Sequence, residues 1–217
     1  MRQFNDLQIL MLLVETTRWT ILLSLTAFAG GALLGGMLTV MRIMRNRLVN
    51  LLSRGFTALI QSTPLLMLLF LSFFGLPLVG LDVPAWGAAA FALIVFTAAF
   101  LADIWQSAVR SVPSGQWDAA RAIGLGFLQS LRLVIIPQAI RIATPSTVGF
   151  SVQVVKGTAL ASIIGFVELT KAGTMLNNVT FRPFFVFSIV ALLYFALCFP
   201  LSLLARRLER RASETHA

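Results

Sequence analysis

Three ionisable residues lie inside or at the ends of long uncharged stretches: Asp103, Lys156 and Glu168. A charge at the centre of a bilayer costs about 2.5–3.5 kcal/mol on insertion scales, so such residues usually face the interior of a helix bundle or a wet cavity. Lys156 falls near the middle of its apolar stretch. It is therefore either a residue of a solute pathway or one half of a buried ion pair, for which Asp103 is the candidate partner.

Residues for enzymatic chemistry are missing from the sequence. Its one histidine, His216, lies in a polar tail, and its one cysteine, Cys198, lies in an apolar segment, so neither a metal cluster nor a Ser-His pair is expected. The stretch 149–158 comes nearest to a phosphate-binding loop but lacks the glycine directly before Lys156. We expect a chain that is not an enzyme and that binds no cofactor itself.

The composition identifies the class of protein. Of the 217 residues, 58% are hydrophobic and only 12% are charged, which is far outside the range of soluble globular domains. The apolar stretches do not alternate as barrel strands do, and each can cross a hydrocarbon core of roughly 30 Å as a helix. We predict an all-α membrane protein with a single domain, residues 1–217, and five transmembrane helices at about 19–41, 55–75, 84–108, 143–167 and 183–205.

The basic residues predict the orientation in the membrane. Arginines fill the connections 42–54 and 110–141 and the stretch after residue 205, whereas the connections 75–85 and 168–182 are poor in them. By the positive-inside rule the arginine-rich segments are cytoplasmic, which places the N-terminus outside and the C-terminus inside. The net charge of +9 thus reflects topology, and the expected partner surface is the lipid membrane and not a nucleic acid.

Proline and glycine modify two of the predicted spans. Pro64 removes one hydrogen bond inside the second span, where we expect a kink. Gly31 and Gly35, four residues apart in the first span, provide a small face that permits close packing of another helix.

The connection 110–141 is predicted to hold two short helices. Ser114 can cap the first, which Gly124 can end, and the second is expected at about 127–135, before Pro137. The first helix either packs on the ends of its own spans or docks a soluble partner. Its surface offers apolar anchors and small residues that permit close approach, namely Trp117, Ile123, Ala119 and Ala120.

This connection resembles a known motif. Asp118-Ala119-Ala120-x-x-x-Gly124, followed by nine residues and Val134-x-Ile136-Pro137, is similar to the E-A-A-x-x-x-G-x(9)-I-x-L-P loop of permease subunits of ABC importers. Further motifs recur in the order typical of polar amino-acid importer permeases, and the resemblance covers about residues 15–210. These motifs are Ser62-Thr63-Pro64-Leu65-Leu66, Phe74-Gly75-Leu76-Pro77, Gly115-Gln116, Pro137-Gln138-Ala139, Lys156-Gly157-Thr158-Ala159-Leu160 and Glu168-Leu169-Thr170.

The resemblance implies a type I importer with the MetI-like permease fold in a bacterial inner membrane. Its partners would be a second permease, two cytoplasmic ATP-binding subunits that hold ATP and Mg²⁺, and an extracytoplasmic solute-binding protein. The first loop helix would be the coupling helix, seated in a groove of the ATPase. The residues that the motif assigns to this contact are Trp117, Asp118, Ala119, Ala120, Ile123 and Gly124.

Three departures from the family pattern bear on the solute. Members commonly have Arg-Gly-Thr-Pro at 61–64, Glu-Ile-x-Arg-Gly-Gly at 103–108 and Lys-Asp-Thr-Ser-Leu at 156–160. This chain instead has Gln61-Ser62-Thr63-Pro64, Asp103-Ile104-Trp105-Gln106-Ser107-Ala108 and Lys156-Gly157-Thr158-Ala159-Leu160, so that its main substitutions are Gln61, Gln106 and Gly157. Either a second, non-identical permease, which we favour, holds more of the solute site, or the solute carries a different charge. The expected pathway residues are Gln61, Thr63, Pro64, Asp103, Lys156, Gly157, Thr158 and Glu168.

The sequence therefore predicts a permease subunit of an ATP-driven importer for a polar amino acid or a related small polar solute. An alternative is an autonomous ion-coupled carrier or channel that uses Asp103 and Lys156, with Glu168, as a relay. Many such carriers contain two related halves, and no internal repeat is visible in this chain.

Overall fold

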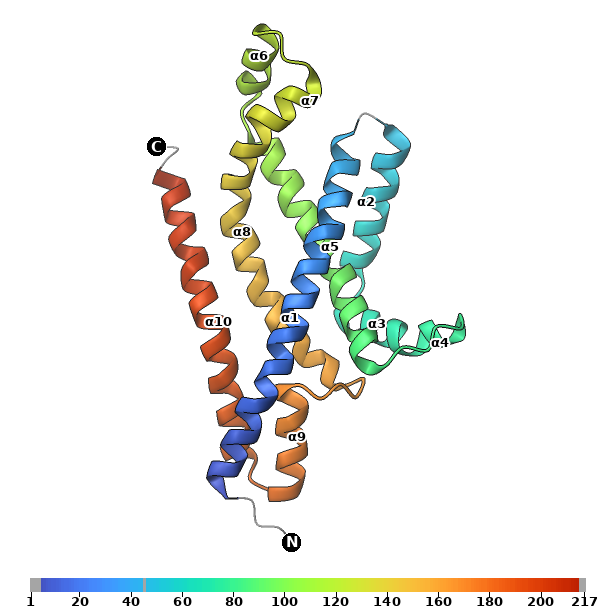
Figure 1. Ribbon diagram of the computed structural model, residues 1–217, viewed down its shortest axis with the longest axis vertical. Coiled ribbons are helices and arrows are strands. Elements are labelled where there is room, and N and C mark those ends of the chain that lie inside the picture. The colour runs from blue at the N-terminus through green and yellow to red at the C-terminus, as the bar shows by residue number, and fades with distance from the viewer. Residues whose placement is uncertain (1–4, 45, 215–217) are drawn as a thin grey trace.

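A computed structural model describes residues 5–44 and 46–214 (Figure 1). These residues form helices and no strands. The α-helices are α1 (Asp6–Ile43), α2 (Arg47–Ser62), α3 (Leu65–Phe70), α4 (Leu76–Leu78), α5 (Ala85–Ser111), α6 (Ser114–Ala122), α7 (Phe127–Ser130), α8 (Ile136–Gly157), α9 (Leu169–Thr180) and α10 (Pro183–Glu214). Short π-helical segments at Leu71–Gly75 and Leu131–Ile135, and a 3-10 segment at Thr158–Ser162, connect some of them.

The long helices form one elongated bundle in which α1 packs on α5, α5 on α8, and α8 on α10 (Figure 1). The segment α6–α7 projects beyond one end, which we call the loop end. The last turns of α1 and α10 point towards this end, and α9 lies at the opposite end beside the beginning of α1 (Figure 1).

Most residues of the five predicted apolar stretches lie in helices, except for 63–64, Pro84 and 163–167. Four helical runs are long and apolar enough to cross a membrane: Asp6–Ile43, Ala85–Ser111, Phe127–Ser162 and Pro183–Ala212. The predicted span 55–75 is instead divided between α2 and the segment 65–78, which meet at an angle of 103°.

Pro64 is the cause of this break, and the expectation of a mere kink is wrong. Thr63 and Pro64 both have extended backbones, with ψ of 127° and 137°. A proline disfavours the helical conformation in the residue before it, so α2 ends at Ser62 and α3 begins anew after Pro64. As a result α3 and α4 run sideways out of the bundle (Figure 1).

Pro137 does not stop a helix, contrary to the sequence expectation. The predicted helix at 127–135 continues without interruption into α8, so that it forms the first turns of the fourth span. A π-helical segment precedes Pro137, and another precedes Pro77 in the same register. Because a proline lacks the N–H and its ring clashes with the preceding turn, a widened turn there lets the helix continue.

Small residues bring α1 and α5 together, as predicted. A Cβ atom added to Gly31 would lie 2.5 Å from Cβ of Thr97, and one added to Gly35 would lie 3.0 Å from the carbonyl oxygen of Ala98. The first distance is shorter than a side chain tolerates and the second is tight, so the close approach of the two backbones depends above all on the glycine at position 31.

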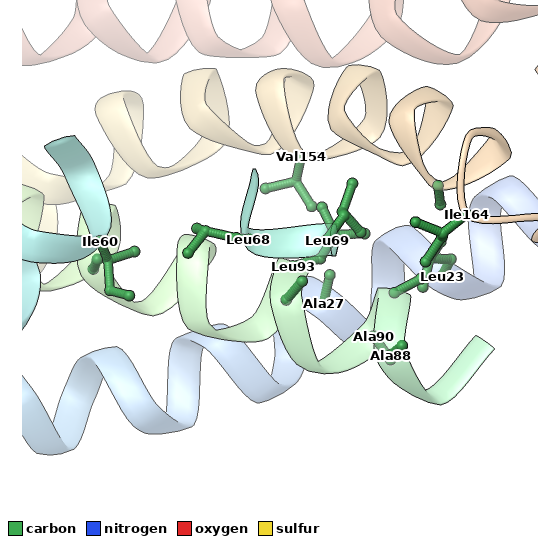
Figure 2. Packing of buried hydrophobic residues seen from close by; sticks show 14 residues of the cluster. Leu23, Ala27, Ile60, Leu68, Leu69, Ala88, Ala90, Leu93, Val154 and Ile164 are labelled. Atoms are coloured by element: carbon green, nitrogen blue, oxygen red, sulfur yellow. The ribbon is translucent and has the colours of Figure 1, made fainter. Parts of the chain in front are cut away.

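The largest apolar cluster joins α1, α3, α5 and α8 near the middle of the bundle (Figure 2). Leu23 and Leu93 contribute from α1 and α5, Leu69 from α3, and Val154 from α8, and all four are at most 1% exposed. The sideways segment is thus anchored where it leaves the bundle, through Leu68 and Leu69.

Replacing Gly31 with alanine should destabilise the protein by about 2 kcal/mol, because the new methyl group overpacks the α1–α5 contact against Thr97. Thermal unfolding in detergent micelles measures the loss. The matched control is Gly55→Ala in α2, where an added Cβ meets nothing within 4 Å and a helical alanine is favoured over glycine. Equal melting temperatures for the two variants would contradict the packing argument.

Candidate functional site

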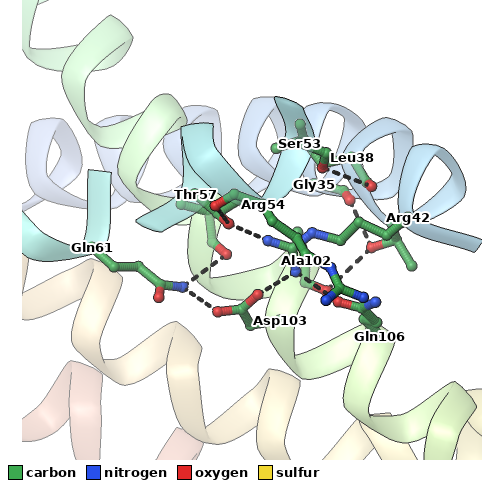
Figure 3. Close-up of polar contacts among 12 residues, drawn as sticks. Gly35, Leu38, Arg42, Ser53, Arg54, Thr57, Gln61, Ala102, Asp103 and Gln106 are labelled. Carbon is green, nitrogen blue, oxygen red and sulfur yellow. Dashed lines mark hydrogen bonds and ion pairs between the residues drawn. The ribbon is translucent and has the colours of Figure 1, made fainter. Parts of the chain in front are cut away.

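A buried arginine organises the polar residues at the loop end of α1, α2 and α5 (Figure 3). Arg42 is only 5% exposed. Its guanidinium forms an ion pair with Asp103 of α5, donates to the Gln106 side chain at 2.9 Å and donates to the hydroxyl of Thr57 of α2. One cation therefore ties three helices together in a region that offers few other partners for polar groups.

Asp103 also accepts a hydrogen bond from Gln61. The amide nitrogen of Gln61 donates to Oδ2 of Asp103 at 2.6 Å and to the backbone carbonyl of Ala99 at 3.1 Å (Figure 3). The structure thus brings together Gln61 and Asp103, two of the residues that the sequence assigned to the pathway. The Asp103 side chain remains 44% exposed, so this network is open on one side.

The sequence left two roles open for Lys156, and the one that pairs it with Asp103 is not found among the described residues, where Asp103 pairs with Arg42. Lys156 is exposed on α8 and has no hydrogen bond or ion pair within residues 5–44 and 46–214. It lies close enough to Cys198 of α10 to interact with it electrostatically. In the sequence, Arg42 indicates only the orientation of the chain in the membrane, because basic residues are common at the cytoplasmic ends of membrane-spanning helices.

Arg42 also gives a physical account of the neutral residue at position 61. The family pattern has arginines at positions 61 and 106 and an acid at position 103, whereas this chain has glutamine at both 61 and 106. In this chain the acid is kept, and Arg42 supplies the cation from a different helix while Gln61 donates without charge. The departure at position 61 is therefore compensated within the same network.

Glu168 is fully buried, and it belongs to a different cluster at the opposite end. Oε1 accepts the backbone N–H of Lys171 at 2.9 Å, so the carboxylate caps the N-terminus of α9. Oε2 accepts from the Tyr194 hydroxyl of α10 at 2.7 Å and from the Thr20 hydroxyl of α1 at 3.4 Å. Burial raises the pKa of this carboxyl group, against the opposing effect of its hydrogen bonds.

These contacts correct the expectation for Glu168. With 0% of the residue exposed, it does not line an open pathway in this conformation and instead holds α1, α9 and α10 together. No hydrogen bond or ion pair among the described residues connects it with Asp103 or Lys156, so the three groups form no relay here.

Gly157 faces apolar neighbours. A Cβ atom there would lie 3.0 Å from Cδ2 of Leu65 and 3.4 Å from Cδ2 of Leu93. In this backbone the acid of the family pattern would be pressed against α3 and α5, so packing explains the glycine. Thr158 is equally buried and donates to the carbonyl of Val155 at 2.7 Å.

At the break of the second span, neighbouring Thr63 and Pro64 differ in exposure. The Thr63 hydroxyl donates to the carbonyl of Leu59 at 2.8 Å, one of the groups left without a helical partner. Pro64 is exposed on the surface of the chain.

The projecting helix α6 presents one face to its own chain. Ala120 is 2% exposed, and Trp117 packs on the apolar cluster around Val112 and Ile135 while its ring stacks on Phe127 at 5.8 Å. In this conformation the buried Ala120 and the half-buried Trp117 thus face their own chain, and their assignment to the ATPase contact stays a prediction. Pro113, not Ser114, precedes the first turn as N-cap, and no side chain caps it.

The opposite face of α6 is exposed, and Gln116 accepts a hydrogen bond there from Gln138 of α8 at 3.2 Å. Ile123 is 78% exposed, Ala119 is exposed, and Asp118 forms an ion pair with Arg121 at 2.6 Å on the surface. Gly124 ends the helix with φ of +82°, a conformation that favours glycine, and its N–H donates to the Arg121 carbonyl at 2.9 Å. An outward surface with one large apolar side chain thus stands at the tip of the loop end.

Comparison with known proteins identifies the family of the chain. The family model described as binding-protein-dependent transport system inner membrane component matches residues 31–214. A probable glutamine ABC transporter permease of Bacillus subtilis (strain 168) is 32% identical over 197 residues, covering 91% of each chain. The glutamine transport system permease of Escherichia coli (strain K12) is 31% identical over 202 residues, covering 92% of each.

Two solved structures share the fold. The crystal structure of an amino acid ABC transporter with histidines has a TM-score of 0.88 and 31% identity, covering 96% of this chain and 99% of that one. The inward-facing MetNI methionine ABC transporter has a TM-score of 0.71 at 23% identity, covering 91% of this chain and 93% of that one, and supports the fold alone.

A double-mutant cycle tests whether Arg42 takes the role of an arginine at position 61 as the cationic partner of Asp103. Arg42→Gln should lower the free energy of unfolding by about 2 kcal/mol, because a charged donor and its hydrogen bonds are lost. Gln61→Arg in the same chain should restore at least half of this loss, since Gln61 already reaches Asp103. Chemical unfolding of both single variants, the double variant and the wild type in detergent gives the coupling energy. Additive effects would refute the compensation.

Proposed function

Because the chain belongs to the family of inner membrane components of binding-protein-dependent transport systems, and is therefore an inner-membrane permease of an ABC importer, we propose that its solute is a polar amino acid or a related small polar compound. This solute class is supported by relatives named for glutamine and for amino acids that match along most of the chain. The permease role itself needs no catalytic residue in this chain.

The energy for transport would come from two ATP-binding subunits that carry ATP and Mg²⁺ in the cytoplasm. The observation that supports this most directly is the outward face of α6, where Ala119 and Ile123 are exposed at the tip of the loop end. The small Ala119 lets the wall of a groove come close to α6, and the large apolar Ile123 can insert into such a groove on an ATP-binding subunit. Movement of that groove would be transmitted through α7 directly into α8, because Phe127–Ser162 is one continuous run.

The same proposal requires the orientation that the arginines predict. The loop end would be cytoplasmic and the N-terminal end would face outward, towards a solute-binding protein. An autonomous carrier is less well supported, because Asp103, Lys156 and Glu168 are not connected. Solute flux by the purified chain alone in liposomes, without ATP, would nevertheless contradict the subunit assignment.

A solute path would form between two permease chains. Lys156 and Gln153 are exposed on α8, and Asp103 is partly exposed on α5, although they lie within or near membrane-spanning helices. Polar side chains at such depth favour a protein or water neighbour over lipid. The second permease is identical or, as we favour, a paralogue that supplies further solute contacts.

Ala119→Arg should reduce solute uptake and solute-stimulated ATPase activity of the assembled importer by about tenfold, which corresponds to a loss of about 1.4 kcal/mol of docking free energy. The reason is that a bulky cation on the outward face of α6 would keep the helix out of its groove. Transport into proteoliposomes and phosphate release are the measurements.

Asn178→Arg is the matched control, because it adds the same charge to an exposed position of α9 at the opposite end. Wild-type uptake by Ala119→Arg would remove the coupling role of α6. Ala120→Arg is unsuitable for this test, since Ala120 is buried and its replacement would disturb the fold of the loop itself.

Lys156→Met should lower the initial uptake rate by about tenfold while leaving assembly with the partner subunits intact, because the exposed cation is available to a solute carboxylate and not engaged in an ion pair. Lys171→Met in α9 is the control for loss of one positive charge. Uptake kinetics and co-purification of the subunits are compared. Unchanged kinetics in Lys156→Met would leave this lysine without a role in the pathway.

A further inference from the structure

A cavity of about 500 Å³ lies between α8 and α10 at the loop end, next to the link from α5 to α6. It is lined by residues of both long helices and by Pro113 of that link. None of the residues discussed for coupling or for the solute pathway lines it. Its occupant therefore has to be argued from its own side chains.

Two arginines from different helices meet at this cavity. Arg141 of α8 and Arg211 of α10 both line it, and no acidic side chain described by the structure does. Three further arginines, Arg206, Arg207 and Arg210, precede Arg211 in α10, with Glu209 among them. Two positive charges held at one cavity attract an anion, and the planar guanidinium group matches the oxygens of a phosphate in particular.

The depth of the cavity points to the source of the phosphate. Arg141 is the last charged residue before the uncharged run 142–155, and the uncharged run of α10 ends at residue 205, directly before Arg206. The cavity therefore stands at the boundary between the apolar and charged parts of both helices, where the headgroups of a bilayer lie.

The apolar residues that line the cavity suit the first segments of the acyl chains of a lipid, next to its headgroup. Ile142 and Pro145 offer apolar surface towards the span, and Leu208 does so on α10. The polar side chains beside the arginines already donate elsewhere, Gln138 to Gln116 and to the Val134 carbonyl and Thr144 to the Ile140 carbonyl, so the two arginines are the donors that face an anion. A freely dissolved phosphate would use the arginines and leave this apolar surface uncovered.

We propose that this cavity binds the phosphate headgroup of an anionic phospholipid from the leaflet at the loop end. Arg141 and Arg211 contact the phosphate from the two sides, and the acyl chains follow the apolar surfaces of α8 and α10. Because α8 continues into α7, and Pro113 precedes α6, the lipid would be held directly beside the base of the projecting loop. This site is independent of the solute and of the ATPase contact.

The test is native mass spectrometry of the full chain in nonionic detergent with added phosphatidylglycerol or phosphatidylcholine of identical acyl chains. We expect the wild type to retain one phosphatidylglycerol about tenfold more tightly than phosphatidylcholine, as two arginines near an anionic headgroup predict. The variant Arg141→Gln/Arg211→Gln should lose this preference. Arg211→Gln alone, near the end of α10, should lose about half of it on a logarithmic scale.

The matched control is Arg54→Gln/Arg206→Gln, which removes two exposed arginines near the loop end that do not line the cavity. It should keep the preference of the wild type, and helix content from circular dichroism should be equal in all variants. An unchanged preference in the Arg141 and Arg211 variants would overturn the proposal.

Two other occupants are distinguished by competition. Displacement of phosphatidylglycerol by millimolar inorganic phosphate would assign the cavity to a soluble anion. Loss of the lipid adduct on addition of the purified ATP-binding subunits would assign it to a protein contact. Either result would overturn the lipid proposal, whereas retention of the adduct in both experiments supports it.

Discussion

The close contact between α1 and α5 is the constraint on which the rest of the structure depends. It exists because Gly31 and Gly35 carry no side chain where the two backbones meet. Once the helices are this close, Arg42 of α1 reaches Asp103 of α5, and α2 is added through Thr57 and Gln61. A steric feature thus determines an electrostatic one, in a region where an arginine without a partner would be very costly.

Two prolines, Pro64 and Pro137, determine where the helices differ from uninterrupted α-helical spans. At Pro64 the chain turns through 103°, and the α3 segment is fixed by Leu65 against Gly157 and by Leu69 in the central cluster. At Pro137 a π-helical segment precedes the proline and the helix continues. The same residue type therefore ends one helix and is accommodated in another, depending on whether a wider turn precedes it.

The two ends of the bundle differ in what their polar and exposed residues do. At one end the carboxylate of Glu168 caps α9 and joins it to α1 and α10, which makes this end a structural anchor. At the other end α6 stands clear of the spans and keeps an exposed apolar residue at its tip, while its buried face holds it on α8 through Trp117. A rigid connection between a free surface and a long span is what a subunit driven by an external ATPase requires.

The sequence by itself determined the membrane class, the five apolar stretches and the loop motif at 118–137, because composition and local spacing are visible without knowledge of distant contacts. It also predicted that Gly31 and Gly35 permit close packing. Only the tertiary structure decided that Asp103 pairs with Arg42 and not with Lys156, that Glu168 is closed off, and that α6 turns Ala120 inward and Ile123 outward. The physical reason is that charge pairing and the orientation of a short helix depend on which residues, far apart in the chain, come within a few ångströms of each other.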